Sequence, residues 1–270
     1  MTLVAESDRY NFLILLEREL PDHILCYYCK RLHAILDPHW FMPTYISYFR
    51  YSGKRCRNMP CLEARVQSES SHNIYSQFSF PAFQMAMKYY RQGRSYSRML
   101  DFLSVSTCDL PGSYSVLPRI VHGSLLLRQQ HRVVTAPNQR LPSSSHFYVC
   151  PHFRLALDVI SDRGWDVRDR NWGGRRLPRH INLLDPRYRS ELIQCRYCVT
   201  EFRLDFQLFD KGNSIIVFTK WQDLGEGKSP LDYKWACHLY NDNIEWQPKE
   251  FRRGSICAAF ERKDPALFRP

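Results

Sequence analysis

The sequence predicts an irregular α+β protein that bound zinc holds together. Cysteine and histidine residues occur in closely spaced groups typical of metal ligands, namely Cys26-Tyr27-Tyr28-Cys29, Cys150-Pro151-His152 and Cys195-Arg196-Tyr197-Cys198. Helical periodicity is concentrated in the first half of the chain, and alternating apolar residues follow the last of these groups. We therefore expect a helical N-terminal half and a zinc-knuckle β-hairpin in the C-terminal half.

Length and composition are those of a globular protein. The chain has 270 residues, 44% of them hydrophobic, which is enough to bury a substantial core. Its formal net charge of +11 would assist binding to nucleic acid or to acidic partners. The first 20 residues carry several charges and only a short apolar run, and no stretch is long enough to span a membrane. We expect an intracellular protein of the cytoplasm or nucleus, with no membrane partner.

The chain contains ten cysteines. In a reducing compartment, closely spaced cysteine pairs are more often metal ligands or redox sites than disulfides. A redox role needs a thioredoxin-like βαβ setting, which neither Cys-x-x-Cys pair has. We therefore expect these pairs to bind zinc. Three other cysteines have no nearby candidate ligand and are expected to be small buried apolar residues: Cys108, Cys237 and Cys257.

Residues 1–137 are expected to form a helical and irregular N-terminal region that contains the first zinc site. Ser7 or Asp8 can begin a first helix, which Pro21 ends. Pro81 suits the first turn of a second helix that ends at Gly93. The remaining expected elements of this region are a helix at 95–102 and strands at 120–128 and 132–136, with a turn at 129–131.

A polar loop at 137–145 is the best candidate for a domain boundary, and the alternative is one continuous domain. The second region, 146–270, is expected to be a zinc-knuckle α+β unit. In it we expect a strand at 146–150, a helix at 153–163, a hairpin of strands at 200–209 and 215–221, and a final helix at 230–239.

The stronger zinc site consists of Cys150, His152, Cys195 and Cys198. A spacing of one or two residues lets both side chains of a pair reach one ion, while nearby backbone amides donate to the sulfurs. The two halves are separated by 42 residues (153–194), which leaves room for an inserted helix and loop. The alternative is that Cys150 is a buried core thiol and His152 a surface residue.

The other predicted zinc site contains Cys26, Cys29 and His33 on one turn and the segment after it. Its fourth ligand would be Cys61 or Cys56. Cys61 is preferred because Pro60 precedes it in a rigid turn. The alternative is a pair of inert thiols with His33 on a helix face. The sequence thus predicts one or two structural Zn²⁺ ions.

Enzyme signatures are incomplete throughout the sequence. Gly225–Ser229 is similar to the end of a phosphate-binding loop, but Gln222 stands where the first glycine of that motif is needed. Zinc deaminases need a glutamate two residues after the ligand histidine, and none follows His152 at that spacing. The sequence contains no H-E-x-x-H and no G-x-S-x-G motif. No enzymatic activity, catalytic residue or small-molecule substrate is expected.

Several segments together resemble a family of uncharacterised filamentous-fungal proteins, many of which begin with an F-box-like helical segment. The segments that carry this resemblance are Leu20–His33, Phe83–Met87, Cys150–His152, Cys195–Phe202 and Trp221–Gly225. The resemblance extends over most of the chain, and the cysteine and histidine positions match well. Only 25 residues precede Cys26, fewer than a complete F-box contains.

The expected function is that of an intracellular zinc-stabilised module for protein interaction or substrate recognition, which the resemblance associates with F-box proteins. A protein partner is expected. The alternative is a nucleic-acid-binding zinc protein that uses the basic surplus and the arginine-rich stretch at 163–179. In that stretch aspartates alternate with the arginines and would oppose a phosphate backbone, so a solvated loop is the preferred interpretation.

Overall fold

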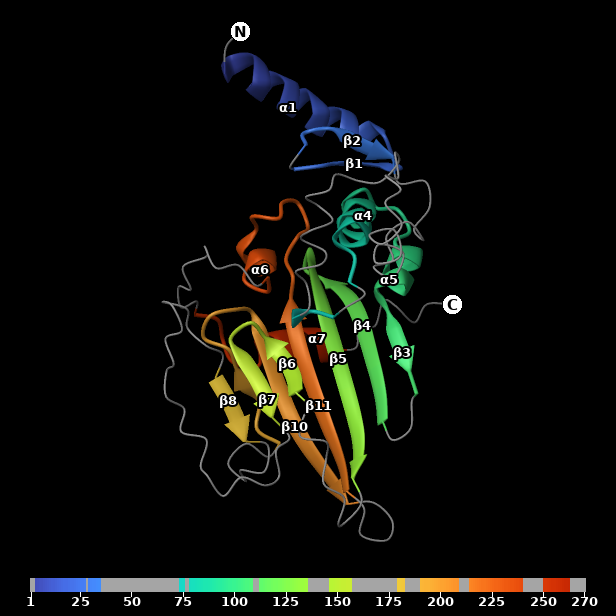
Figure 1. Ribbon diagram of the computed structural model, residues 1–270. Helices are drawn as coiled ribbons and strands as arrows, with labels where there is room; N and C mark the ends of the chain where they lie inside the picture. The colour runs from blue at the N-terminus through green and yellow to red at the C-terminus, as the bar shows by residue number, and fades with distance from the viewer. Residues whose placement is uncertain are drawn as a thin grey trace, which may run out of the picture.

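The computed structural model describes ten stretches of the chain: 3–27, 29–34, 73–75, 78–108, 112–135, 146–156, 179–182, 190–208, 214–239 and 250–262. Within them, helices are combined with largely antiparallel sheets, which confirms the predicted α+β class (Figure 1). No helix in these stretches is both long enough and apolar enough to cross a membrane.

A six-stranded antiparallel sheet forms the centre of the molecule. Its strand order is β3-β4-β5-β11-β10-β9, with β5 and β11 in the middle. The first three strands precede the predicted boundary at 137–145, and the other three follow it, so the two parts of the chain share one sheet. The bounds are β3 (Val105–Thr107), β4 (Gly112–Val121), β5 (Ser124–Thr135), β9 (Ile193–Gln194), β10 (Thr200–Leu208) and β11 (Ser214–Asp223).

Strands β10 and β11 form the hairpin that the sequence predicts. Phe202 and Leu204 on β10 alternate with more polar residues and are fully buried. Their cross-strand partners on β11 are Lys220 and Phe218, so all four side chains point to one face of the sheet. The alternating pattern therefore identifies the buried face correctly. The residues predicted to form the turn lie outside the described part of the chain.

The prediction of a turn at 129–131 is wrong. The chain turns instead at His122 and Gly123, whose φ angles are 49° and 77°, and β5 then runs without interruption. A two-residue turn with two positive φ angles matches the twist of the strands it joins. Gln129, at the expected turn, is buried in the sheet, and its Nε2 donates to Oε1 of Gln222 on β11 at 2.7 Å.

The predicted helical pair is confirmed as α4 (Phe80–Arg91) and α5 (Ser97–Leu103). Ser79 caps α4, since its Oγ accepts a hydrogen bond from Ala82 N at 3.3 Å, and Pro81 occupies the first turn. The broader expectation of a helical N-terminal half is not supported, because β1 to β5 also lie before residue 137. Most of these strands pair with a neighbour in the chain, whereas β5 also pairs with β11, a distant partner that local periodicity does not reveal.

The N-terminal unit consists of α1 (Leu3–Glu19), β1 (His23–Leu25) and β2 (Leu32–Ala34). Helix α1 begins before the predicted caps Ser7 and Asp8. In Figure 1 this unit lies on the side of α4 that is away from the large sheet. Lys88 of α4 joins the two parts, because its buried Nζ donates to three carbonyl oxygens at 2.6–2.7 Å: those of Glu17, Leu20 and His23. The positive charge lies near the C-terminal end of α1, where the helix dipole favours a cation.

A smaller sheet contains β6 (His146–Cys150), β7 (Phe153–Ala156) and β8 (Arg179–Asn182). Strand β7 pairs antiparallel with β6 and parallel with β8. The expected strand at 146–150 is confirmed. The expected helix at 153–163 is wrong in its described part, because the chain turns at Pro151 and His152 and pairs back onto β6. Residues 157–163 lie outside the described part.

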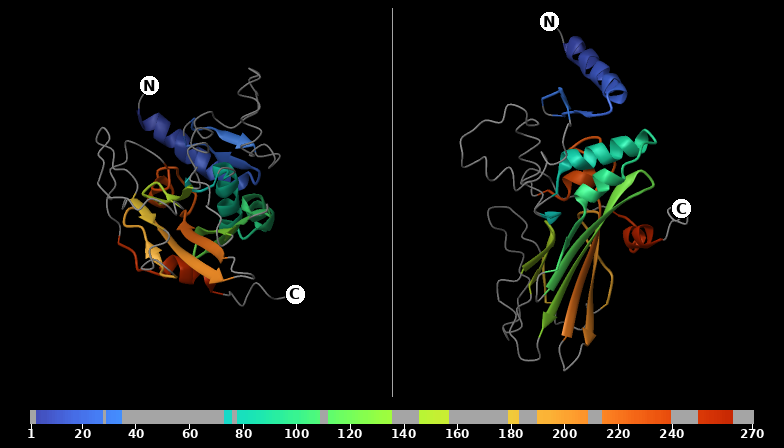
Figure 2. Two further views of the ribbon diagram at one scale, coloured as in Figure 1. Left: turned by 60° about the horizontal axis from the view of Figure 1, so that its bottom comes forward. Right: turned by 90° about the vertical axis from the view of Figure 1, so that its right-hand side faces the viewer.

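The smaller sheet and helix α7 (Ser255–Glu261) lie on opposite faces of the large sheet (Figure 2). Carboxylate oxygens of buried Glu201 accept from Gly254 N and Cys257 N at the start of α7. Arg119 donates to Phe260 O at its end, at 2.6 Å. Each charge suits its end of the helix dipole. The helix expected at 230–239 is only α6 (Tyr233–Ala236), and it is not the last helix.

Candidate metal centres

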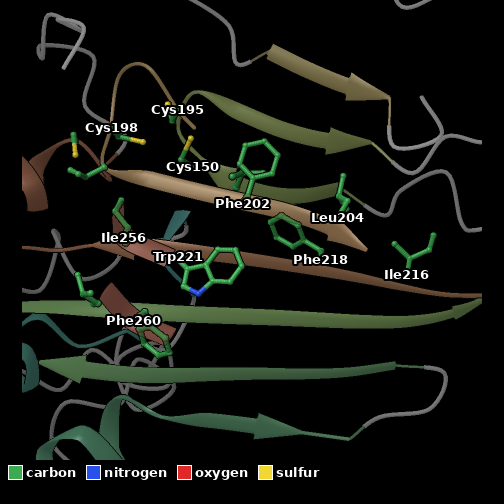
Figure 3. Packing of buried hydrophobic residues seen from close by; sticks show 14 residues of the cluster. Cys150, Cys195, Cys198, Phe202, Leu204, Ile216, Phe218, Trp221, Ile256 and Phe260 are labelled. Atoms are coloured by element: carbon green, nitrogen blue, oxygen red, sulfur yellow. The ribbon is translucent and has the colours of Figure 1, made fainter. Parts of the chain in front are cut away.

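Four of the predicted ligands come from two different sheets. Cys150 is the last residue of β6, and His152 follows it in the turn before β7. Cys195 and Cys198 lie in the turn between β9 and β10. Figure 3 shows the three cysteines close together beside the start of β10. We call this set the buried centre.

The side chains of the buried centre are arranged as metal ligands. One ligand atom from each residue lies within 4.8 Å of the others. A tetrahedral zinc site with Zn–S bonds of about 2.3 Å has ligand atoms about 3.8 Å apart, so only small adjustments are needed to bind an ion. All four residues are buried, with at most 3% of their surface exposed. The donor set and the spacing therefore both fit a metal ion.

The backbone shapes the Cys195–Cys198 turn for this purpose. Cys195 N donates to Thr200 O at 2.9 Å, and Thr200 N donates to Cys198 O at 2.8 Å, which closes the turn. Tyr197 N donates to Cys195 Sγ at 3.4 Å, and Cys198 Sγ donates to Thr200 Oγ1 at 3.2 Å. A backbone donor such as Tyr197 N stabilises negative charge on a thiolate ligand. The zinc knuckle that the sequence predicts is thus a well-bonded turn.

Aromatic residues cover the centre on one side. The rings of His152 and Tyr197 lie 5.4 Å apart. The Tyr233 hydroxyl, from α6, donates to Tyr197 O at 2.8 Å and fixes the turn. These contacts link the centre to α6 and help to exclude water from it.

The three thiols of the buried centre lie close enough to affect one another's pKa values. Burial raises the pKa of Cys150 and of Cys198 well above the ordinary thiol value. Burial acts on Cys195 in the same direction, but hydrogen bonds from Cys150, Cys198 and His152 outweigh it and lower the pKa of Cys195. Several negative charges in one buried place are unfavourable without a cation. A bound metal ion supplies that charge and deprotonates its thiol ligands.

A second group, which we call the hairpin centre, contains Cys26, Cys29 and His33. Its ligand atoms also lie within 4.8 Å of one another. The group follows β1 and ends in β2, so one hairpin supplies every residue. Cys26 N donates to Arg31 O at 2.9 Å, and Lys30 N donates to Cys26 O at 3.0 Å. These bonds close the turn tightly.

The hairpin centre is less buried than the first. Cys26 is buried, whereas Cys29 and His33 are half-exposed. His33 Nε2 lies 3.0 Å from Cys29 Sγ. Burial, and then the charge of Arg31, lower the pKa of His33 and favour the neutral imidazole that binds metals. Cys56 and Cys61, the candidates for a fourth ligand, lie outside the described residues, so that choice stays a prediction.

The sequence does not predict that two further residues, Cys237 and Lys220, lie near the buried centre. Cys237 belongs to the same apolar cluster as its three cysteines, and burial raises its pKa to about 12. Lys220 is buried on β11 and interacts electrostatically with Cys150 and Cys198. The apolar strand pattern of β11 could have indicated that the side chain of Lys220 faces inward. Of the other cysteines, Cys237 is buried as expected, but Cys108 is exposed, which corrects that prediction.

The chain matches no protein-family model, no curated protein and no solved structure.

Proposed function

We propose that this protein is an intracellular zinc-stabilised module for protein interaction or substrate recognition, in which the buried centre holds a structural Zn²⁺. The observation that carries the proposal is the convergence of Cys150, His152, Cys195 and Cys198 within 4.8 Å. Three soft thiolates and one imidazole are ligands that zinc prefers.

A structural role follows from the number and origin of the ligands. Four protein side chains complete a tetrahedral zinc site and leave no position for a reactive water. The ion would connect the turn after β6 with the turn before β10, and so join the small sheet to the large one. In such a site the binding free energy of the ion contributes directly to folding.

The interaction role rests on helix α1. Phe12 is 60% exposed and Leu15 is 57% exposed, although both are large apolar residues of a helix. Lys88 fixes the end of this helix to α4, so the apolar side chains are presented on an anchored element. Exposed apolar groups on an anchored helix are typical of surfaces that bind other proteins.

Elemental analysis tests the metal part of the proposal. Purified protein should contain between one and two zinc ions per chain. A well-folded preparation without metal would overturn the proposal.

Affinity capture from a filamentous-fungal lysate, the source that the family resemblance suggests, tests the interaction part. One variant bait, the α1 variant, carries Phe12→Ser and Leu15→Ser. The matched control bait carries Leu231→Ser, which alters a residue outside α1 that is 65% exposed. We expect the α1 variant alone to lose its partners. Equal capture by all baits would contradict the role of α1. Loss of capture after nuclease treatment, with a steep dependence on salt, would favour nucleic-acid binding instead.

A further inference from the structure

Lys220 places a cationic side chain in the interior beside the buried centre. It lies on β11 opposite Phe202 of β10, and only 2% of its surface is exposed. Its Nζ donates to Asn73 O at 2.8 Å, to Ile74 O at 3.2 Å and to Val149 O at 3.3 Å. Val149 directly precedes the ligand Cys150, so the ammonium group lies next to the centre.

Hydrogen bonds to carbonyl groups satisfy the N–H groups of this lysine but do not neutralise its charge. Burial lowers the pKa of Lys220 to about 7, and the charges of Cys150 and Cys198 act in the opposite direction. A buried ion is costly unless an opposite charge lies nearby. The thiolates of the centre supply that charge.

The positive charge of Lys220 balances the net charge of the buried centre when the centre holds a divalent ion. Three thiolates carry three negative charges, the imidazole is neutral, and an ion such as Zn²⁺ contributes two positive charges. The loaded centre therefore has a net charge of −1 in an interior where all its ligands are buried. One ammonium group makes the combined set neutral.

We propose that Lys220 is the counter-cation of the buried centre. The inference rests on the proposed zinc site and adds the residue that balances its charge. Lys220 is thus a positioning residue that acts on the metal through charge.

The test compares zinc affinities by chelator competition in the full-length chain. All variants carry Cys29→Ser, which removes a ligand of the hairpin centre. Lys220→Met should weaken zinc binding by roughly tenfold or more, the usual effect of losing a residue that supports metal ligands. Cys195→His makes the loaded centre neutral without Lys220. The loss of zinc affinity caused by Cys195→His should therefore be much smaller in the Lys220→Met background than in the background that retains Lys220.

Lys88→Met is the matched control. Lys88 is also buried and also donates to three carbonyl groups, but at the N-terminal unit. We expect it to leave zinc affinity at the buried centre unchanged. Equal losses for the Lys88 and Lys220 variants, or additive effects of Lys220→Met and Cys195→His, would overturn the inference. A parent chain that binds no zinc would instead overturn the proposed function.

A measurement on the unaltered zinc-loaded chain covers the case in which Lys220→Met does not fold. Proton–nitrogen NMR of ¹⁵N-lysine-labelled protein reports how many protons each Nζ carries. We expect a slowly exchanging NH₃⁺ signal for Lys220 at neutral pH. A neutral amine in the zinc-loaded state would overturn the inference.

Discussion

The two candidate metal centres use similar ligands at very different distances along the chain. The hairpin centre takes its described ligands, Cys26, Cys29 and His33, from eight consecutive residues of one hairpin. The buried centre joins a turn at 150–152 to a turn at 195–198 and so connects two sheets. The first is half-exposed, whereas the second is buried.

Two sites with the same ligand chemistry can therefore contribute unequally to the stability of the fold. Linking distant segments removes more conformational freedom from the unfolded chain than linking neighbours does. A metal ion at the buried centre should therefore stabilise the whole molecule. An ion at the hairpin centre should order mainly the N-terminal unit.

The largest expected effect comes from Cys198→Ser. The buried centre would keep three good ligands and one weak one, and the β10–β11 hairpin would lose its anchor. Because a structural metal contributes directly to folding, we expect a loss of more than about 4 kcal/mol, or insoluble protein. Thermal unfolding and zinc content are the measurements. Cys108→Ser, at an exposed cysteine, is the control. A Cys198→Ser protein that melts within a degree or two of wild type would contradict the structural role.

Acid should destabilise the region beside the buried centre through His238. This residue is fully buried, with Nδ1 near Gln222 Nε2 and Nε2 near Asp223 O. Burial lowers its pKa from 6.5 to about 4. Above pH 6.5 both the folded and the unfolded forms hold a neutral imidazole, and stability is lost as the pH falls from there toward 4. The loss should reach about 3 kcal/mol, at about 1.4 kcal/mol per pKa unit.

His238→Gln isolates this contribution, because glutamine can keep both hydrogen bonds and does not titrate. Urea unfolding at a series of pH values should show a flatter acid dependence for the variant than for wild type. Metal release at low pH affects both proteins, so the difference between their slopes is the quantity to compare. Parallel slopes would exclude His238 as a source of acid sensitivity.

Lys88→Met should separate the hairpin centre from the rest of the fold. Three carbonyl groups at the end of α1 and the start of β1 would lose a charged donor. We expect the N-terminal unit to open more readily, by roughly 2 kcal/mol, while the large sheet is unchanged. Hydrogen exchange resolved along the sequence measures both. Increased exchange throughout the sheet would show that the N-terminal unit is not an independent part.

The smallest effect on global stability is expected from Cys29→Ser. The zinc content should fall toward one ion per chain, because one hairpin supplies the described ligands of this centre. Global stability should change by less than about 1 kcal/mol, or no more than about 4 °C in melting temperature. Calorimetry and elemental analysis on the same sample check this. A drop as large as that of Cys198→Ser would invalidate the comparison between the two centres.

Features that depend on neighbouring residues could be predicted from the sequence. Closely spaced cysteines mark metal-binding turns, and alternation in 200–208 marks the buried face of β10. Features that depend on distant partners could not. Gln129 lies in a predicted turn, yet its hydrogen-bond partner Gln222 lies 93 residues away. The start of the expected helix at 153 became a strand because the turn after Cys150 returns it to β6.

In the candidate centres, too, the features set by neighbouring residues could be predicted and those set by distant residues could not. Sequence spacing indicates which ligands form pairs, but it does not reveal that the turn after β6 meets the turn before β10. The sequence does not predict the burial of Lys220, because a lysine in a strand is usually exposed. Its burial depends on carbonyl groups of residues 73, 74 and 149, which come from two other parts of the chain.

The pairing of β5 with β11 also has a consequence for synthesis on the ribosome. Thr135 pairs with Ser214, and Leu126 pairs with Asp223, so β5 must wait for a strand that ends 88 residues later. At about 5–20 residues per second, the wait lasts roughly 4–18 s. During that time the edge of β5 that pairs with β11 is open, and Leu126 is not yet covered, because the other buried residues of its cluster all follow it in the chain. Unpaired apolar edges aggregate readily, so nascent chains that stall before residue 214 need protection by chaperones.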